Sequence, residues 1–68
     1  MDIKITLKAA RVNAGLTQAQ LGKKLGVSRG LVNGWEKGKV SMREAYIYAF
    51  CAITGINESN IIFPKRYA

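Results

Sequence analysis

The chain has 68 residues, which is enough for one small hydrophobic core and one functional surface. Its 11 lysine and arginine residues outweigh 4 aspartate and glutamate residues, so the net charge is +7 and a polyanionic partner is favoured. Because histidine is absent, cysteine occurs once and the acids are scattered, we expect no enzyme, no cofactor and no metal site. Nor do we expect a secretion signal or a membrane-spanning helix.

Two short helices are predicted in the N-terminal half of the chain. The first runs from about Thr6 to Ala14, and Gly15 is its natural stop. The second begins at Thr17, because the run TQAQ places a threonine three residues before a glutamine, as in a capping box. Gly26 ends it, and the next helix follows almost at once.

A third helix is predicted to begin at Ser28, a favourable N-cap residue. At about 100° of rotation per residue, Leu31, Val32 and Trp35 fall on one side, which we interpret as core rather than as a platform for stacked bases. The other side carries Arg29, Gly30, Asn33 and Gly34. Each glycine costs an exposed helix about 1 kcal/mol relative to alanine, so two of them on one face require an explanation.

A fourth helix is predicted from Ser41 to Thr54, because the run SMRE forms a second capping box with Glu44. Its inward side is expected to carry Ala45, Tyr48, Ala49, Ala52 and Ile53. A short fifth helix is predicted from Glu58 to Ile62. Since no strand-like alternation lasts more than four residues, the expected fold class is all-α with five helices.

The second and third helices, joined by the turn GVS, form a candidate helix-turn-helix. The run LTQAQLGKKLGVSRGLVNGWEKGK, from Leu16 to Lys39, closely resembles the lambda-repressor-like, Cro-like helix-turn-helix family. The residues that match are Leu16, Thr17, Gln18, Leu21, Leu25, Gly26, Val27, Ser28, Trp35, Glu36 and Gly38. The resemblance covers about residues 5–63 and implies one compact five-helix DNA-binding domain over residues 1–68, with 64–68 as a short tail.

The chain departs from the family pattern mainly at small residues. Gly22 replaces the usual alanine, which we interpret as a place of close approach between the two helices. Gly30 and Gly34 replace larger side chains, and three explanations stay open. They let the helix approach the groove floor or leave space for a thymine methyl group, they receive a helix of another protein, or they reflect drift in a helix that reads DNA weakly.

The resemblance implies that the third helix lies in the major groove and that its N-terminal half meets base edges. Base readout is then expected from Gln18, Ser28, Arg29, Gly30, Asn33 and Gly34. Among these, Arg29 suits guanine and Asn33 suits adenine. Phosphate contacts are expected from Thr17, Arg11, Lys39 and Arg43. The family also implies a structural ion pair between Arg11 and Glu36 that holds the third helix against the first.

The predicted function is that of a sequence-specific, DNA-binding transcriptional regulator similar to phage or prophage Cro-like or repressor-type proteins, in the cytoplasm of a bacterial host. Double-stranded DNA is the expected partner, together with a second copy on a palindromic operator. Of Ile61, Ile62 and Phe63, two are assigned to the core and one to a two-fold contact. The alternative is a protein-interaction module, an antirepressor, modulator or antitoxin that binds a partner repressor through the same face.

Overall fold

The structure, a computed structural model, describes residues 3–67, so residues 1, 2 and 68 of the expected domain lie outside it. Within that range the chain forms four α-helices: α1 (Leu7–Asn13), α2 (Gln18–Leu25), α3 (Arg29–Glu36) and α4 (Glu44–Thr54). The other elements are a single 3₁₀ turn, η1 (Glu58–Asn60), and two short strands, β1 (Ile5–Thr6) and β2 (Ile61–Ile62).

Side-chain caps begin the first three helices. Thr6 caps α1, the capping box of Thr17 and Gln20 begins α2, and Ser28 caps α3. Gly26 ends α2 with φ at 74°, in the left-handed region where glycine lacks the steric penalty of other residues. The predicted caps at Thr17 and Ser28 are therefore confirmed, and the short turn brings α2 and α3 together.

The N-terminus of α4 differs from the prediction. The helix begins at Glu44 without a side-chain cap, so the capping box predicted at Ser41 is wrong. Instead, the backbone of Met42 pairs with the C-terminal segment: its N–H donates to the carbonyl oxygen of Lys65 at 2.9 Å, and its carbonyl accepts from the N–H of Tyr67 at 3.3 Å. This extended pairing delays the start of α4 and ties part of the expected tail to the protein.

The fifth predicted helix is present only as a short turn and ends earlier than Ile62. Only one 3₁₀ turn forms at Glu58–Asn60, and the chain then continues as β2, which pairs in parallel with β1 through Ile5 and Ile61. The expectation of no strands is corrected at the same place. The reason is that β-branched residues such as Ile61 and Ile62 favour extended backbone, and this pairing buries Ile61 to 6% exposure.

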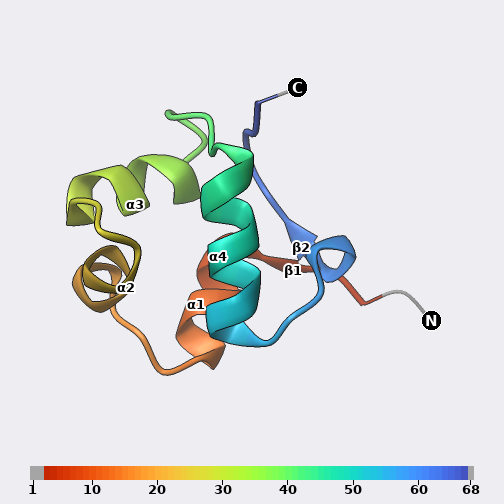
Figure 1. Cartoon of the computed structure of the whole chain (residues 1–68). Coiled ribbons are helices and arrows are strands. Elements are labelled where there is room, and N and C mark those ends of the chain that lie inside the picture. Colours follow the sequence, from red (N-terminus) through yellow and green to blue (C-terminus); the bar gives the residue numbers. More distant parts are fainter. Residues whose placement is uncertain (1–2, 68) are drawn as a thin grey trace.

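Helix α4 lies at the centre of the molecule, with α2 and α3 on one side and the two strands on the other (Figure 1). The largest buried side chains come from all four helices and the α3–α4 loop: Trp35, Phe50, Leu7, Leu21, Met42, Ile47 and Val32. Leu31 packs against this core from its edge. The prediction that Leu31, Val32 and Trp35 form the core side of α3 is therefore confirmed.

The predicted inward side of α4 is right for Ile53, which packs against the core, and wrong for three of the other residues. Tyr48 is 61% exposed and Ala45 and Ala52 are exposed, whereas Ile47 and Phe50 are buried. This helix carries apolar residues on all sides, so their spacing alone does not define the buried face. Burying isoleucine and phenylalanine removes more apolar surface from water than burying alanine, which decides the orientation.

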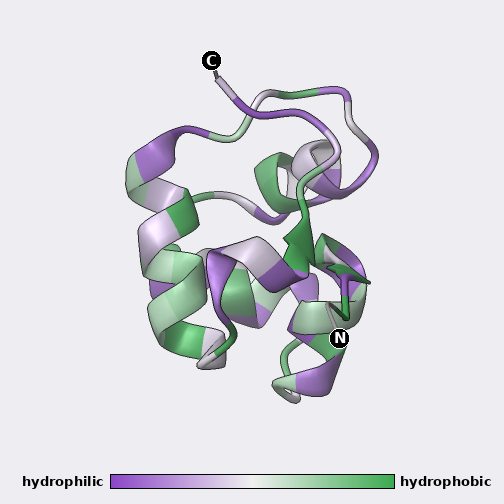
Figure 2. Ribbon diagram, turned by 90° about the vertical axis from the view of Figure 1, so that its right-hand side faces the viewer, coloured by the Kyte–Doolittle hydropathy of each residue, from purple (hydrophilic) through white to green (hydrophobic). Residues whose placement is uncertain are grey.

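The last apolar residues divide as the sequence suggested, with two in the core and one outside. Ile61 is buried, and Phe63 packs edge-on against Phe50 with ring centroids 6.5 Å apart. Ile62 stays 47% exposed. Figure 2, which turns the strand side toward the viewer, shows β2 as a hydrophobic stretch in front of the helices.

Candidate nucleic-acid interface

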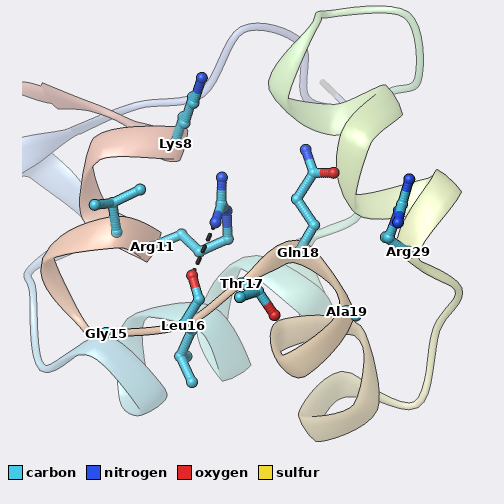
Figure 3. Close-up of a pocket in the computed structure, with 9 residues that line it drawn as sticks. Lys8, Arg11, Gly15, Leu16, Thr17, Gln18, Ala19 and Arg29 are labelled. Carbon is cyan, nitrogen blue, oxygen red and sulfur yellow. Dashed lines mark hydrogen bonds between the residues drawn. The ribbon is translucent and has the colours of Figure 1, made fainter.

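A buried ion pair joins α1 to the last turn of α3. The Nε of Arg11 lies 2.6 Å from the Oε2 of Glu36, and the two side chains are 8% and 4% exposed. The Nη1 of Arg11 also donates to the carbonyl oxygen of Leu16 at 2.8 Å, shown as a dashed line in Figure 3. The pair expected from the family resemblance is present, and it holds α1, the loop before α2 and α3 in one arrangement.

Gln18, the first residue of α2, extends this arrangement toward the outer side of α3. Its Nε2 donates to the Oε1 of Glu36 at 3.0 Å and to the Oδ1 of Asn33 at 3.1 Å. Two residues expected to read bases are thus hydrogen-bonded to each other. The network from Arg11 through Glu36 and Gln18 to Asn33 connects the three helices that form this face.

Arg29 lies beside this network at the start of α3, and it is exposed. In Figure 3 the polar ends of Lys8, Gln18 and Arg29 point to the same side of the molecule, each from a different helix. Together they border a hollow of about 810 Å³. Within residues 3–67, Arg29 forms no ion pair, so its guanidinium remains free for an external ligand.

Lys8 was not predicted as part of this face. It precedes Arg11 by three residues on α1, and residues at that spacing lie on the same side of a helix. The signal was therefore available once Arg11 had been placed. Lys8 adds a positive charge opposite Arg29 across the hollow, which suits a phosphate.

The start of α2 offers backbone donors. The capping box uses the N–H groups of Thr17 and Gln20, with distances of 2.9 and 3.1 Å to their acceptors. The first turn therefore leaves the N–H groups of Gln18 and Ala19 for an anion. The hydroxyl of Thr17 accepts from Gln20, so this residue acts first as a cap.

The other two predicted phosphate contacts lie after α3. Lys39 is exposed, and its backbone N–H donates to the carbonyl oxygen of Gly34 at 2.9 Å, which fixes the loop on the end of α3. Arg43 is exposed at the start of α4, and its guanidinium carbon lies 4.6 Å from the centre of the Tyr67 ring. The C-terminal segment therefore helps to position this cation.

The two glycines of α3 have different surroundings. A methyl group on Gly30 would meet only the Oγ of Ser28, at 3.9 Å, in otherwise open space. A Cβ on Gly34 would lie 2.7 Å from the Cγ2 of Val40. The expectation that both glycines lie on an open face is therefore wrong for Gly34. The loop folds back because Lys39 and Val40 both donate to the Gly34 carbonyl, and Val40 then covers the glycine.

Gly22 shows a similar close approach inside the helix-turn-helix. A Cβ at this position would lie 2.7 Å from the carbonyl oxygen of Val27. The backbone of the turn thus passes directly over α2, which confirms the structural interpretation of this glycine.

Cys51 lies on α4 and is half-buried. Burial raises the pKa of its thiol, the charge of Glu58 raises it further, and the charge of Arg66 opposes the shift.

Comparison with known families settles the class of the protein. A family model described as helix-turn-helix matches residues 7–59. The chain belongs to the Cro/lambda-repressor-like helix-turn-helix family. It is therefore a DNA-binding regulator, and the family is not one of enzymes. The searches of curated proteins and of solved structures returned no match. Across residues 3–67, every helix is too short or too polar to cross a membrane.

Glu36→Gln should destabilise the protein, because it removes the charge that compensates the buried Arg11. We expect the free energy of unfolding to fall by about 3 kcal/mol, measured by urea denaturation. The matched control is Glu58→Gln, which breaks the half-exposed pair between Glu58 and Arg66 and should cost less than about 1 kcal/mol. Equal losses in the two variants would contradict a special role of the buried pair.

The glycines of α3 should respond to alanine in opposite directions. Gly30→Ala should raise the free energy of unfolding by about 0.4–1 kcal/mol, because it restricts the unfolded chain at an open site. Gly34→Ala should lower it by about 1 kcal/mol, because the new methyl group meets Val40. Adding Val40→Ala should reverse that loss, and a thermal-unfolding double-mutant cycle measures the coupling. Equal stabilisation by both alanines would show that Val40 does not restrict Gly34.

Proposed function

We propose that this protein binds duplex DNA sequence-specifically, with the N-terminal half of α3 in the major groove, and regulates transcription as a phage or prophage repressor-type protein. The observation that carries the proposal is the exposed Arg29 at the start of α3, which forms no ion pair in the described part of the chain and lies beside Gln18 at the start of α2. A helix terminus that carries arginine is suited to the O6 and N7 acceptors of guanine.

Cations on both sides of α3 support a backbone contact along the same face. Lys8 lies on the α1 side, and Lys39 and Arg43 lie beyond the end of α3. In such an arrangement phosphate contacts position the helix, while the side chains of α3 read the bases. The net charge of +7 favours association with DNA at low salt.

We further propose that two copies bind a palindromic operator, each presenting one α3. Ile61 and Phe63 are used in the core, so Ile62 is the member of this segment that remains for a contact between copies. The proposed cellular setting is the bacterial cytoplasm.

The direct test is to incubate the protein with fragmented DNA from its source genome, recover bound fragments at rising salt, and sequence them. Enrichment of a shared palindromic sequence is the expected result. A lack of enrichment at every salt concentration would contradict the proposal. If a protein partner were recovered instead, and if Arg29→Ala abolished its binding, the function of an antirepressor or antitoxin would replace the proposed function.

Lys39→Ala should weaken binding about equally on the selected site and on random duplex DNA. Since one phosphate contact is lost, the slope of log K against log salt should decrease by about one unit. Fluorescence anisotropy at several salt concentrations measures both quantities. A loss confined to the selected site would contradict a phosphate role for Lys39.

Arg29→Ala should instead relax specificity. We expect a loss of about 1–3 kcal/mol on the selected site, together with loss of preference at one base position per half-site. Competition with single-base variants of the site measures the preference. An unchanged base profile would show that Arg29 does not read a base.

A further inference from the structure

The side-chain amides of Gln18 and Asn33 each have a donor end and an acceptor end, and their orientation determines what α3 offers to DNA. The carboxylate of Glu36 can only accept hydrogen bonds while it is paired with Arg11. The amide atom of Gln18 that lies 3.0 Å from the Oε1 of Glu36 must therefore be the donor, Nε2. The buried ion pair thus determines which way the Gln18 amide faces.

The same constraint passes from Gln18 to Asn33. The Nε2 of Gln18 carries two hydrogens, one for Glu36 and one for the Asn33 atom at 3.1 Å. Because a donor faces Asn33, that atom must be the acceptor, Oδ1. The Nδ2 of Asn33 forms no hydrogen bond within the described range of 3–67, so the donor end is the one left for an external partner.

We propose that the Arg11–Glu36 pair, acting through Gln18, holds Asn33 as a hydrogen-bond donor and thereby makes it select guanine over adenine. Guanine presents two acceptors, O6 and N7, in the major groove. Adenine presents N7 beside the N6 donor, and a two-bond contact with it needs the Oδ1 of Asn33 as well. This inference rests on the proposed function and replaces the expected pairing of Asn33 with adenine. Gln18 and Glu36 act in it as positioning residues.

The free protein provides a first test that needs no DNA. The side-chain amide hydrogens of Gln18 have two acceptors, whereas those of Asn33 have none among residues 3–67. In nuclear magnetic resonance spectra of ¹⁵N-labelled protein, the Gln18 amide hydrogens should exchange with water at least several-fold more slowly than those of Asn33. Equal exchange rates, or slower exchange at Asn33, would overturn the proposed orientation.

The decisive test is selection of bound duplexes from a randomised pool, with the base at the position next to Asn33 read by sequencing. The wild-type protein should prefer guanine to adenine there by about tenfold, as for one good base contact. Gln18→Met, which removes the donor and frees Asn33 to turn, should shift the preference toward adenine. Asn33→Asp keeps an acceptor for Gln18 but presents oxygen to DNA, and should shift it toward cytosine, whose N4 is a donor.

Lys24→Met is the matched control, because it also replaces a long polar side chain of α2 by methionine and should leave the base preference unchanged. Thermal unfolding confirms that each variant is folded, and Asn33→Asp tests the inference by itself if Gln18→Met does not fold. A selected site with adenine preferred in the wild type, or the same preference in all variants, would overturn the inference but leave the proposed function intact. Failure to select any sequence would overturn both.

Discussion

One buried ion pair, between Arg11 and Glu36, holds together the face that we propose for DNA binding. Removing Arg11 and Glu36 from water is costly, and such a pair is retained only where further hydrogen bonds satisfy its remaining atoms. Leu16 and Gln18 supply those bonds, and within residues 3–67 no buried side-chain nitrogen or oxygen lacks a partner. Because Arg11, Leu16, Gln18 and Glu36 come from α1, the following loop, α2 and α3, this network ties these elements to one another.

Local sequence signals were sufficient for the helix-turn-helix itself. A threonine or serine that caps a helix, and a glycine that ends one, act on their immediate neighbours, so Thr17, Gly26 and Ser28 could be placed without knowing the rest of the fold. The core side of α3 was equally clear, because large apolar residues lie on one side of it only. The family resemblance then supplied the ion pair, which spacing alone does not indicate.

The errors arose where a contact with another part of the chain decides the structure of a helix. The backbone of Met42 pairs with Lys65 and Tyr67, and α4 then begins at Glu44 without the capping box predicted at Ser41. Gly34 looks like an open helix position until the α3–α4 loop brings Val40 over it. The hydrogen bond between Gln18 and Asn33 likewise joins two helices whose relative position the sequence does not specify. The buried face of α4 was predicted incorrectly at several positions for another reason. This helix is apolar on all sides, so the spacing of its apolar residues does not show which face is buried.

The parallel pairing of Ile5 with Ile61 affects how the protein folds during synthesis. These residues lie near opposite ends of the chain, yet Ile61 completes the core beside Leu7 and Phe50. The entropy of closing this loop has to be paid before the long-range contact can stabilise the core. A ribosome therefore has to release the chain at least as far as Ile61 before the core can close, so this pairing is expected to be a late step of folding.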